Sequence, residues 1–485
     1  MDSTQGSDGA IAIGSRLEPL FDRFLVEETR GAVRLELGTP VERELVFVHD
    51  RPWEGNRSGL TTIIRDGAVC RMYYCGSQLD LHEGGYRIPH NYTCYARSDD
   101  GLAWTRPELE LVDTPGGEPN NAILTGQPPL TFTPFLDTNP DCAPEQRFKA
   151  LALRYDPPPR ALYGFASADG IHWNQIGDRP LITTGYFDSQ NIAFWDATRG
   201  EYRAYVRDFH GSRDAAAREV AVRDVRTCTS PDFLAWSEPQ WLSYEPERFA
   251  EIYTNQINPY YRAPHLFLGL PMRYVTGHGH VTELNERISR SQERFGTSYT
   301  DTALMTSRDG STFDLWGEAF IRPGPVVKGR WHYGANGTAL GMLETPDEGG
   351  ATELSLFVDE GGWDHPSRLR RYALRVDGFA SLRAGAAGGE VLTKPLVFDG
   401  DRLVLNFSTS ALGWLRVEVQ DREGRSIDGL TEDDCIEVFG DDIEHEVRWQ
   451  DAPNLRRLAG TPVRLRITMR DTDLYSLRFR DRGHG

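Results

Sequence analysis

The stretch from Tyr186 to Arg207, YFDSQNIAFWDATRGEYRAYVR, decides the fold. It places one carboxylate, Asp188, just before the apolar run 192–195, and a turn-forming DATRGE segment then leads into the alternating run 202–206. Short apolar runs bounded by turn residues are typical of β-strands, so the stretch predicts a hairpin with an acid at its open end. Similar units precede and follow it, which predicts a chain built from repeated antiparallel strands.

A Ser-x-Asp-Gly-x-x-Trp pattern marks the repeat. It is complete at 98–104 and 167–173, degraded at 230–236, stretched at 307–316 and faint at 377–379. Each copy follows a strand-like run, and the Asp-Gly step predicts a tight turn. Five repeated four-stranded units without helical periodicity predict an all-β fold with a five-bladed β-propeller, although an array of two-sheet sandwiches is the alternative.

The repeating sequence pattern ends at the small-residue run RAGAAGG at 383–389. The alternating runs beyond it lack the Asp-Gly-Trp mark, which predicts a separate β-sandwich of a common domain size. We therefore expect lead-in strands over residues 1–45, the propeller over 46–385 and the sandwich over 386–485.

The composition narrows the range of partners. The 485 residues carry a formal net charge of -19, which argues against nucleic acid or an anionic membrane as a partner, because both are polyanions. The first fifteen residues lack the basic and apolar order of a signal peptide, and no run of about 18 apolar residues follows. These features predict a cytoplasmic protein, and a small-molecule substrate fits better as its partner. A homo-oligomer is compatible with the composition.

The sequence predicts neither a metal centre nor a redox cofactor. Six scattered cysteines are expected to be reduced thiols rather than disulfides or zinc ligands, and no Gly-rich dinucleotide motif follows a strand. A structural calcium in the central channel is possible, but no ligand spacing supports it. His278 and His280 lie in a polar segment up to Thr300 that we expect to be a long loop over the pocket.

Polar residues at the starts of the innermost propeller strands are expected to converge on one funnel. The acids at or near such starts are Asp50, Glu54, Asp188 and Glu251, and Glu360 follows the apolar run of the fifth unit. Isolated acids in loops more often cap turns or pair with arginines, which is the alternative for each of them. The residues expected to bind a substrate are Asn56, Arg57, Arg207, Tyr253, Asn255, Arg273, Asn336 and Trp363.

The segment FDSQNIAFW, Phe187 to Trp195, resembles the Arg-Asp-Pro element of the five-bladed propeller glycoside hydrolases of families 32, 43 and 68. The resemblance covers the whole chain and is closest to the family 32-like group. It implies cleavage of a furanoside, fructosyl or arabinosyl, or of a small oligosaccharide, with Asp188 as the aspartate that stabilises the transition state. The chain has GNRSG at 55–59 and TNQ at 254–256, where that family has its other two acidic motifs.

Glycoside cleavage needs a protonated acid beside the leaving oxygen and a carboxylate facing the sugar carbon or its water. We expect Asp50 or Glu54 as nucleophile or base, and Glu251 or Glu360 as acid. One alternative is a transglycosylase or phosphorylase on the same scaffold, in which arginines would hold phosphate. Another is a carbohydrate-binding protein without catalysis, in which the arginines merely balance the funnel acids.

Overall fold

The structure is a computed structural model that describes residues 9–117, 119–126, 131–155, 160–211, 221–247, 250–450 and 454–481. The chain forms two compact units. Unit 1 comprises Met1–Thr39, Tyr261–Ala263 and Arg375–Gly485, and unit 2 comprises Pro40–Tyr260 and Pro264–Leu374. The first strands of the chain therefore share a unit with its last strands, whereas the sequence suggested a separate lead-in segment and a boundary at 385/386.

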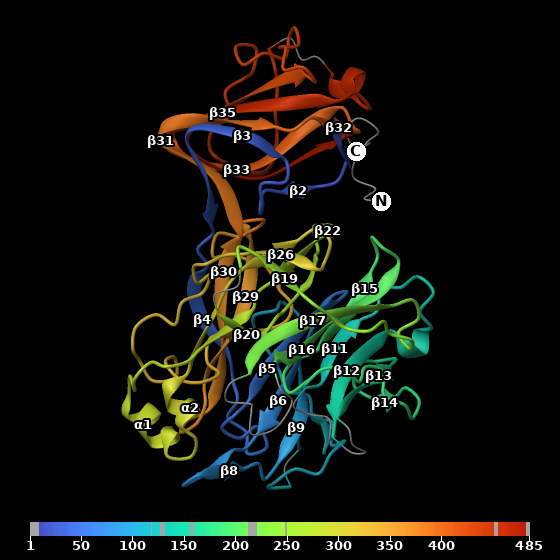
Figure 1. Cartoon of the computed structure of the whole chain (residues 1–485), viewed down its shortest axis with the longest axis vertical. Coiled ribbons are helices and arrows are strands. Elements are labelled where there is room, and N and C mark those ends of the chain that lie inside the picture. Colours follow the sequence, from blue (N-terminus) through green and yellow to red (C-terminus); the bar gives the residue numbers. More distant parts are fainter. Residues whose placement is uncertain are drawn as a thin grey trace. The chain divides into compact units, whose positions relative to one another are not determined.

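The first three strand groups of unit 2 are four-stranded antiparallel sheets whose strands follow chain order (Figure 1). Short apolar strands separated by turns allow each sheet to form locally. The groups are β5 (Gly59–Asp66), β6 (Val69–Ser77), β9 (Asn91–Ser98) and β10 (Ala122–Thr125); β11 (Thr133–Leu136), β12 (Phe148–Arg154), β13 (Ala161–Ser167) and β14 (Asn174–Gln175); and β15 (Ile192–Asp196), β16 (Glu201–His210), β17 (Val222–Ser230) and β18 (Gln240–Trp241).

The fourth group consists of two sheets. One sheet contains β20 (Glu251–Thr254), β23 (Met272–Val275) and β24 (Tyr299–Thr302). The other contains β19 (Ser243–Glu245), β26 (Thr312–Leu315), β25 (Met305–Ser307), β22 (Ala263–Gly269) and β21 (Asn258–Tyr260). A small hairpin of β7 (Asp80–His82) and β8 (Gly85–Arg87) is separate from the groups.

The fifth group joins the two ends of unit 2. Its strands are β27 (Gly337–Thr338), β29 (Thr352–Gly361), β30 (Ser367–Arg375) and, as the outermost strand, β4 (Val41–Val48), while β28 (Leu343–Pro346) also pairs with β29. A first strand that completes the last sheet ties the two ends of unit 2 together. The all-β prediction is confirmed, and the five groups agree with the five blades expected.

The repeated Asp-Gly-Trp motif is a turn that also connects neighbouring groups. Asp169 Oδ1 accepts hydrogen bonds from the backbone N–H groups of the two residues after Gly170, each at 2.8 Å. Gly170 has φ +76°, and its carbonyl accepts the Tyr73 hydroxyl of the first group at 2.9 Å. The Tyr205 hydroxyl donates to Gly310 in the same way at 2.8 Å. The turn role expected for these aspartates is therefore confirmed.

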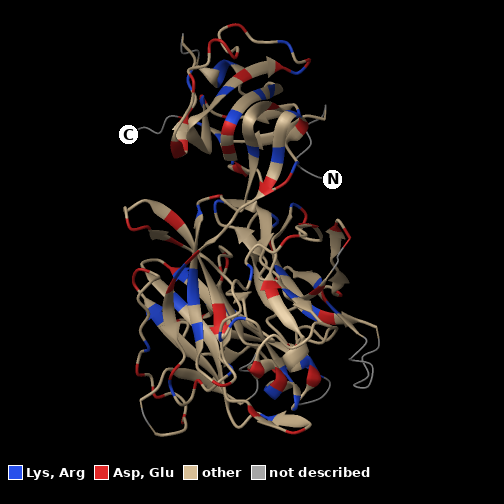
Figure 2. Cartoon of the chain, turned by 90° about the vertical axis from the view of Figure 1, so that its left-hand side faces the viewer, with Lys and Arg blue, Asp and Glu red and all other residues tan. Residues whose placement is uncertain are grey.

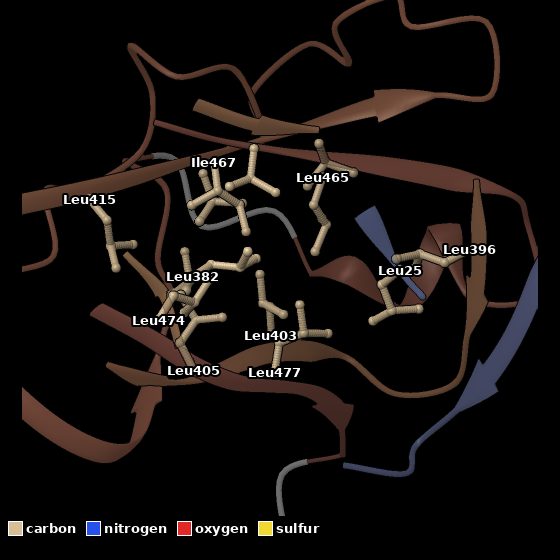
Figure 3. Packing of buried hydrophobic residues seen from close by; sticks show 14 of the residues in the cluster. Leu25, Leu382, Leu396, Leu403, Leu405, Leu415, Leu465, Ile467, Leu474 and Leu477 are labelled. Atoms are coloured by element: carbon tan, nitrogen blue, oxygen red, sulfur yellow. The ribbon is translucent and has the colours of Figure 1, made fainter. Parts of the chain in front are cut away.

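Unit 1 is built around one sheet of long strands. Its order is β1 (Ile11–Gly14), β32 (Leu396–Phe398), β35 (Val463–Arg480), β31 (Ala380–Thr393) and β3 (Val26–Leu37). β2 (Glu18–Pro19) and β33 (Arg402–Asp421) also pair with β35, and β34 (Asp441–Glu446) pairs with β33. Shifts of register within β31 and β33 allow such long strands to bend, and their leucines pack into one apolar core (Figure 3). A sheet that wraps around a core agrees with the expected sandwich.

Residues of both charges are interspersed along the strands of unit 1 (Figure 2). Arg466 of β35 lies 2.7 Å from Glu390 of β31 and 3.7 Å from Glu418 of β33. Opposite charges on neighbouring strands stabilise a sheet face modestly. Arg466 thereby links β35 to both β31 and β33.

Helices are few in the part of the chain that the structure describes. α1 (Glu283–Ser289) and α2 (Glu293–Thr297) are its α-helices, and neither has the length or the apolar character needed to cross a membrane. Two short 3-10 helices span Pro144–Gln146 and Leu455–Leu458. All six cysteines are free thiols and five of them are buried, as the sequence predicted.

Candidate functional site

A cavity of about 950 Å³ lies within unit 2. Asp188, four residues before β15, and Glu251, the first residue of β20, both line it. Arg207 of β16 and Tyr253 of β20 line it as well. Of the residues that the sequence suggested for one funnel, these four line this cavity.

Both carboxylates of the cavity are anchored by arginines. Asp188 forms an ion pair with Arg207. Glu251 accepts hydrogen bonds from the backbone N–H of Arg223 at 2.9 Å and from its Nη1 at 2.8 Å. The side chains of Asp188 and Glu251 are 36% and 22% exposed, so each carboxylate keeps a face toward the cavity. The pair is therefore both oriented and accessible.

Arginines and aromatic rings alternate along the wall of the cavity. The Arg160 guanidinium lies 3.8 Å from the centre of the Tyr186 ring. Arg207 lies 5.9 Å from the same ring, and both Arg207 and Arg223 lie near the Tyr253 ring, at 5.4 and 5.8 Å. A guanidinium over an aromatic face is attracted by the negative potential of the ring. The rings hold several positive groups close together at this wall.

Arg207 is the most enclosed of these cations. Its side chain is 2% exposed, and its Nε has no hydrogen-bond partner among the residues that the structure describes. Burial and, to a smaller extent, the positive charge of Arg223 lower the pKa of Arg207 to about 10, because together they outweigh the neighbouring tyrosines, which raise it. The guanidinium is charged at neutral pH, and one of its donors is unsatisfied.

Two phenols share a short hydrogen bond inside the cavity. The hydroxyl groups of Tyr253 and Tyr333 lie 2.7 Å apart. Burial alone would raise the pKa of Tyr333, but the charge of Arg294, the hydrogen bond from Tyr253 and the charges of Arg57 and Arg223 outweigh it, so that its pKa falls below the ordinary value. Burial raises the pKa of Tyr253. Tyr333 is thus the more acidic phenol of the pair.

Two of the predicted acids lie outside the residues that line the cavity, near the entry to β5. Glu54 is fully buried, and its carboxylate accepts the Tyr74 hydroxyl at 2.6 Å and Arg106 Nε and Nη2 at 2.8 and 3.0 Å. Asp50 is 55% exposed and lies 3.6 Å from Arg106. Glu54 therefore holds a closed network, and Asp50 belongs to the outer surface.

Glu360, the alternative acid, is also enclosed by arginines away from the lining. It lies in β29 with 1% of its side chain exposed. Arg330 at 3.3 Å, Arg368 at 3.2 Å and Arg370 at 2.9 Å surround it. A buried carboxylate with three cationic partners braces the fifth strand group, and its oxygens face protein rather than the cavity.

Several predicted binding residues hold backbone segments in place. Asn56 donates to the carbonyls of Leu79 at 3.0 Å and Trp363 at 2.9 Å. Asn336 donates to two carbonyls at 3.2 and 2.7 Å. Arg273 pairs with Asp301 at 2.7 Å. These amide and guanidinium groups position loops, and they are absent from the cavity lining.

The remaining predicted binding residues divide between support and core. The Arg57 guanidinium lies 4.8 Å from the centre of the Trp363 ring and 5.7 Å from that of Tyr333, so it supports one residue of the lining from outside. Trp363 is buried and donates to His332 at 3.1 Å. Asn255 is buried and accepts the backbone N–H of Ile257 at 3.1 Å.

Asp359, the residue before Glu360, is a further unusual acid. Its Oδ1 accepts the Thr61 hydroxyl at 3.0 Å, and no ion pair reaches it among the described residues. Burial raises its pKa to about 7, against the lowering effect of hydrogen bonds from Thr61 and Leu60 and of the charge of Arg57. The sequence interpretation chose Glu360 and missed Asp359, because β29 is buried on both faces and shows no alternation of polar residues.

The segment expected to be a long loop contains α1 and α2. The Thr282 hydroxyl and the Asn285 side chain cap the first turn of α1 reciprocally, a box that the spacing T-x-x-N could have indicated. Residues 292–294, 297 and 298, in and around α2, line the cavity. The segment that we expected to cover the pocket as a loop is therefore partly helical, and its residue Arg294 lines the cavity.

The sequence matches no protein-family model. It is 30% identical over 189 residues to the uncharacterized protein Rv1502 of Mycobacterium tuberculosis strain H37Rv, which is 39% of this chain and 55% of that protein. The uncharacterized protein MT1551 of strain CDC 1551 matches to the same extent. The chain thus spans about half the length of the curated relatives it matches.

Solved structures with partial similarity include several carbohydrate-active proteins. A family 43 arabinoxylan arabinofuranohydrolase from Bacillus subtilis has 11% identity and a TM-score of 0.40, with 92% of this chain and 99% of that chain covered. A family 32 β-fructofuranosidase from Bombyx mori has 9% identity and a TM-score of 0.39, with 93% and 95% covered. An N-acetylgalactosamine deacetylase from F. plautii has 12% identity and a TM-score of 0.38, with 75% and 94% covered. Values this low assign neither a family nor an activity.

Proposed function

We propose that the chain is a glycoside-processing enzyme and that the cavity of unit 2 is its active site. The observation that carries the proposal is that one cavity contains Asp188 and Glu251, two accessible carboxylates held at the starts of neighbouring innermost strands. Most glycosidases use a pair of Asp or Glu residues beside the scissile bond, and this cavity offers such a pair. The tyrosines around them offer ring faces against which the apolar face of a sugar can pack.

In the proposed reaction Asp188 faces the anomeric carbon and stabilises the positive charge that develops there. Glu251 takes a proton from the attacking water. Because arginines pair with both carboxylates, the proton for the leaving oxygen comes from Tyr333, the more acidic phenol of the cavity. The C–O bond breaks, its electron pair goes to the leaving oxygen with that proton, and proton exchange between Glu251 and Tyr333 restores the site.

The proposed substrate is a terminal furanoside, fructosyl or arabinosyl, or a small oligosaccharide that carries one. The resemblance of Phe187 to Trp195 to the Arg-Asp-Pro element of the furanoside-cleaving hydrolases supports this choice. The cavity volume, about 950 Å³, lies at the upper end of the usual range for small-molecule sites and accommodates more than one sugar ring.

Phosphorolysis is the second candidate. Arg160 and Arg294 line the cavity, and neither has a carboxylate partner among the described residues, so a phosphate nucleophile would find unpaired donors there. Phosphate would then accelerate cleavage and produce a sugar phosphate instead of a free sugar.

The test is release of nitrophenol from a panel of 4-nitrophenyl furanosides and pyranosides, with and without phosphate. We expect release from a furanoside by the wild type and a loss of at least about a hundredfold in Asp188→Asn, because the carboxylate charge acts in the transition state. Asp99→Asn, on an exposed turn, is the matched control and is expected to retain the wild-type rate.

Two outcomes would contradict the proposal. Equal rates in Asp188→Asn and the wild type would remove this carboxylate from the reaction. Absence of cleavage by the wild type across the panel, together with a sugar-dependent rise in melting temperature, would identify a carbohydrate-binding protein instead.

A further inference from the structure

The lining of the cavity contains more cations than the carboxylates there can balance. Arg160, Arg207, Arg223 and Arg294 face three acids, Asp188, Glu251 and the exposed Glu293. The chain as a whole carries a net charge of -19, so this wall is a local exception to an acidic protein. Positive groups gathered in a concave pocket concentrate anions there.

The arginines of this wall share aromatic neighbours. Arg207 and Arg223 both lie over the Tyr253 ring, at 5.4 and 5.8 Å from its centre, and the charge of Arg223 disfavours the charged form of Arg207. Arg160 continues the row through the Tyr186 ring, at 3.8 Å. Asp188 and Glu251 each pair with one of these arginines, and a further anion at the wall would favour the charged form of Arg207.

Two guanidinium groups at this wall keep N–H donors that no acid in the described ranges takes up, although Arg207 also pairs with Asp188. Arg207, 2% exposed, keeps an Nε without a hydrogen bond among the described residues, and it lines the cavity. Arg160 donates to the carbonyl of Tyr186 at 3.3 Å, and no carboxylate pairs with it in the described part of the chain. A buried guanidinium with an unused donor costs free energy unless a ligand completes it.

We propose that the wall formed by Arg160, Arg207 and Arg223 binds an oxyanion substituent carried by the substrate, so that the preferred ligand is an acidic saccharide. The substituent is a carboxylate or a phosphate ester, since both present the oxygen pair that guanidinium groups bind in a fork. Only the sugar portion of the ligand rests on the proposed function. The anion site itself follows from the arginines.

The experiment measures binding by calorimetry at constant ionic strength, with the full chain. The probes are fructose 6-phosphate and galacturonate, their neutral parents fructose and galactose, and inorganic phosphate alone. We expect each acidic sugar to bind at least about tenfold tighter than its parent, the effect of one hydrogen bond to a charged group. The advantage should shrink as salt is raised.

Arg160→Gln is the first variant, because its half-buried side chain makes loss of folding less of a concern than at Arg207. It should remove about tenfold of the affinity for acidic sugars and leave that for neutral sugars unchanged. Arg207→Gln should have a larger effect, provided that its melting temperature shows a folded protein. Arg97→Gln, an exposed arginine paired with Asp99, is the control and should bind as the wild type does.

Equal affinity for acidic and neutral sugars would overturn the proposal. So would inorganic phosphate that binds as tightly as fructose 6-phosphate, because the anion would then be a free co-substrate and not a substituent. Tight binding of acidic sugars without cleavage of any glycoside would leave this inference standing and refute the proposed activity.

Discussion

Asp359 offers the sharpest test of the structure, because removal of its charge should stabilise the protein. Its carboxyl group lies beside Thr61 and Gly59 without an ion pair among the described residues, and burial raises its pKa from 3.8 to about 7. One unit of pKa corresponds to about 1.4 kcal/mol. Ionising Asp359 in the folded protein therefore costs about 4 kcal/mol, and Asp359→Asn removes that cost.

The sign of the pH dependence follows from the raised pKa. Below pH 4 the group is protonated in both the folded and the unfolded state, so its charge has no effect on stability. Between pH 4 and 7 the folded state alone keeps the proton, and the wild type loses stability as the pH rises. The stability of Asp359→Asn relative to the wild type should accordingly grow from pH 4 to 7 by about 4 kcal/mol and then level off.

Urea denaturation between pH 4.5 and 8.5, followed by tryptophan fluorescence, measures this difference. Glu360→Gln is the matched control, because it neutralises the neighbouring carboxylate, which pairs with three arginines. That variant should lose about 3 kcal/mol, since it leaves buried cations unpaired. An Asp359→Asn difference that does not change with pH would refute the electrostatic reasoning for this pocket.

Three further outcomes are expected. In denaturation, Gly170→Ala should destabilise the protein by roughly 2 to 3 kcal/mol more than Gly177→Ala. Both residues have positive φ, but only a Cβ at residue 170 would lie 2.5 Å from the Tyr73 hydroxyl. Equal losses of stability would show that the turn does not connect neighbouring strand groups. Tyr333→Phe should lower kcat by at least about tenfold and remove the alkaline limb of the pH profile of activity. Because the pKa of Tyr333 is lowered, the wild type should lose activity at a lower pH than an ordinary tyrosine would give. An unchanged pH profile would exclude Tyr333 as the proton donor. Glu54→Gln should lower the melting temperature and leave KM unchanged, because Glu54 holds a closed buried network. A changed KM with an unchanged melting temperature would show that Glu54 contributes to the active site.

Much of the fold could be predicted because its signals are local. The Asp-Gly-Trp repeats mark the same turn in successive strand groups, and the turn hydrogen bonds are made within a few residues. The residues that close unit 2 and complete unit 1 are distant in sequence: β4 pairs with β30, and β3 pairs with β31. Pairing between strands that are far apart in the chain leaves no pattern in the local sequence. The N-terminal strands could therefore not be assigned to their partners from the sequence.

The candidate site divides in the same way. Asp188 could be predicted because an acid before a short buried strand is a local feature, and Glu251 begins a strand of its own. Arg223 could not be predicted, because it reaches the cavity through its register in β17, opposite Phe209 of the preceding strand β16. Glu54 and Glu360 were further acid candidates in the sequence, and only the arginines that fold against them show that they belong to closed ion-pair networks.

Glu251 and Glu360 are the two acids that test the central claim most directly, because the sequence ranks them alike and the structure separates them. The measurement is kcat/KM of Glu251→Gln and Glu360→Gln on the best furanoside of the panel, at a temperature where both variants are folded. Our interpretation predicts a loss of at least about a hundredfold for Glu251→Gln and a wild-type value for Glu360→Gln. A large loss in Glu360→Gln with full activity in Glu251→Gln would contradict the assignment of the active site to this cavity.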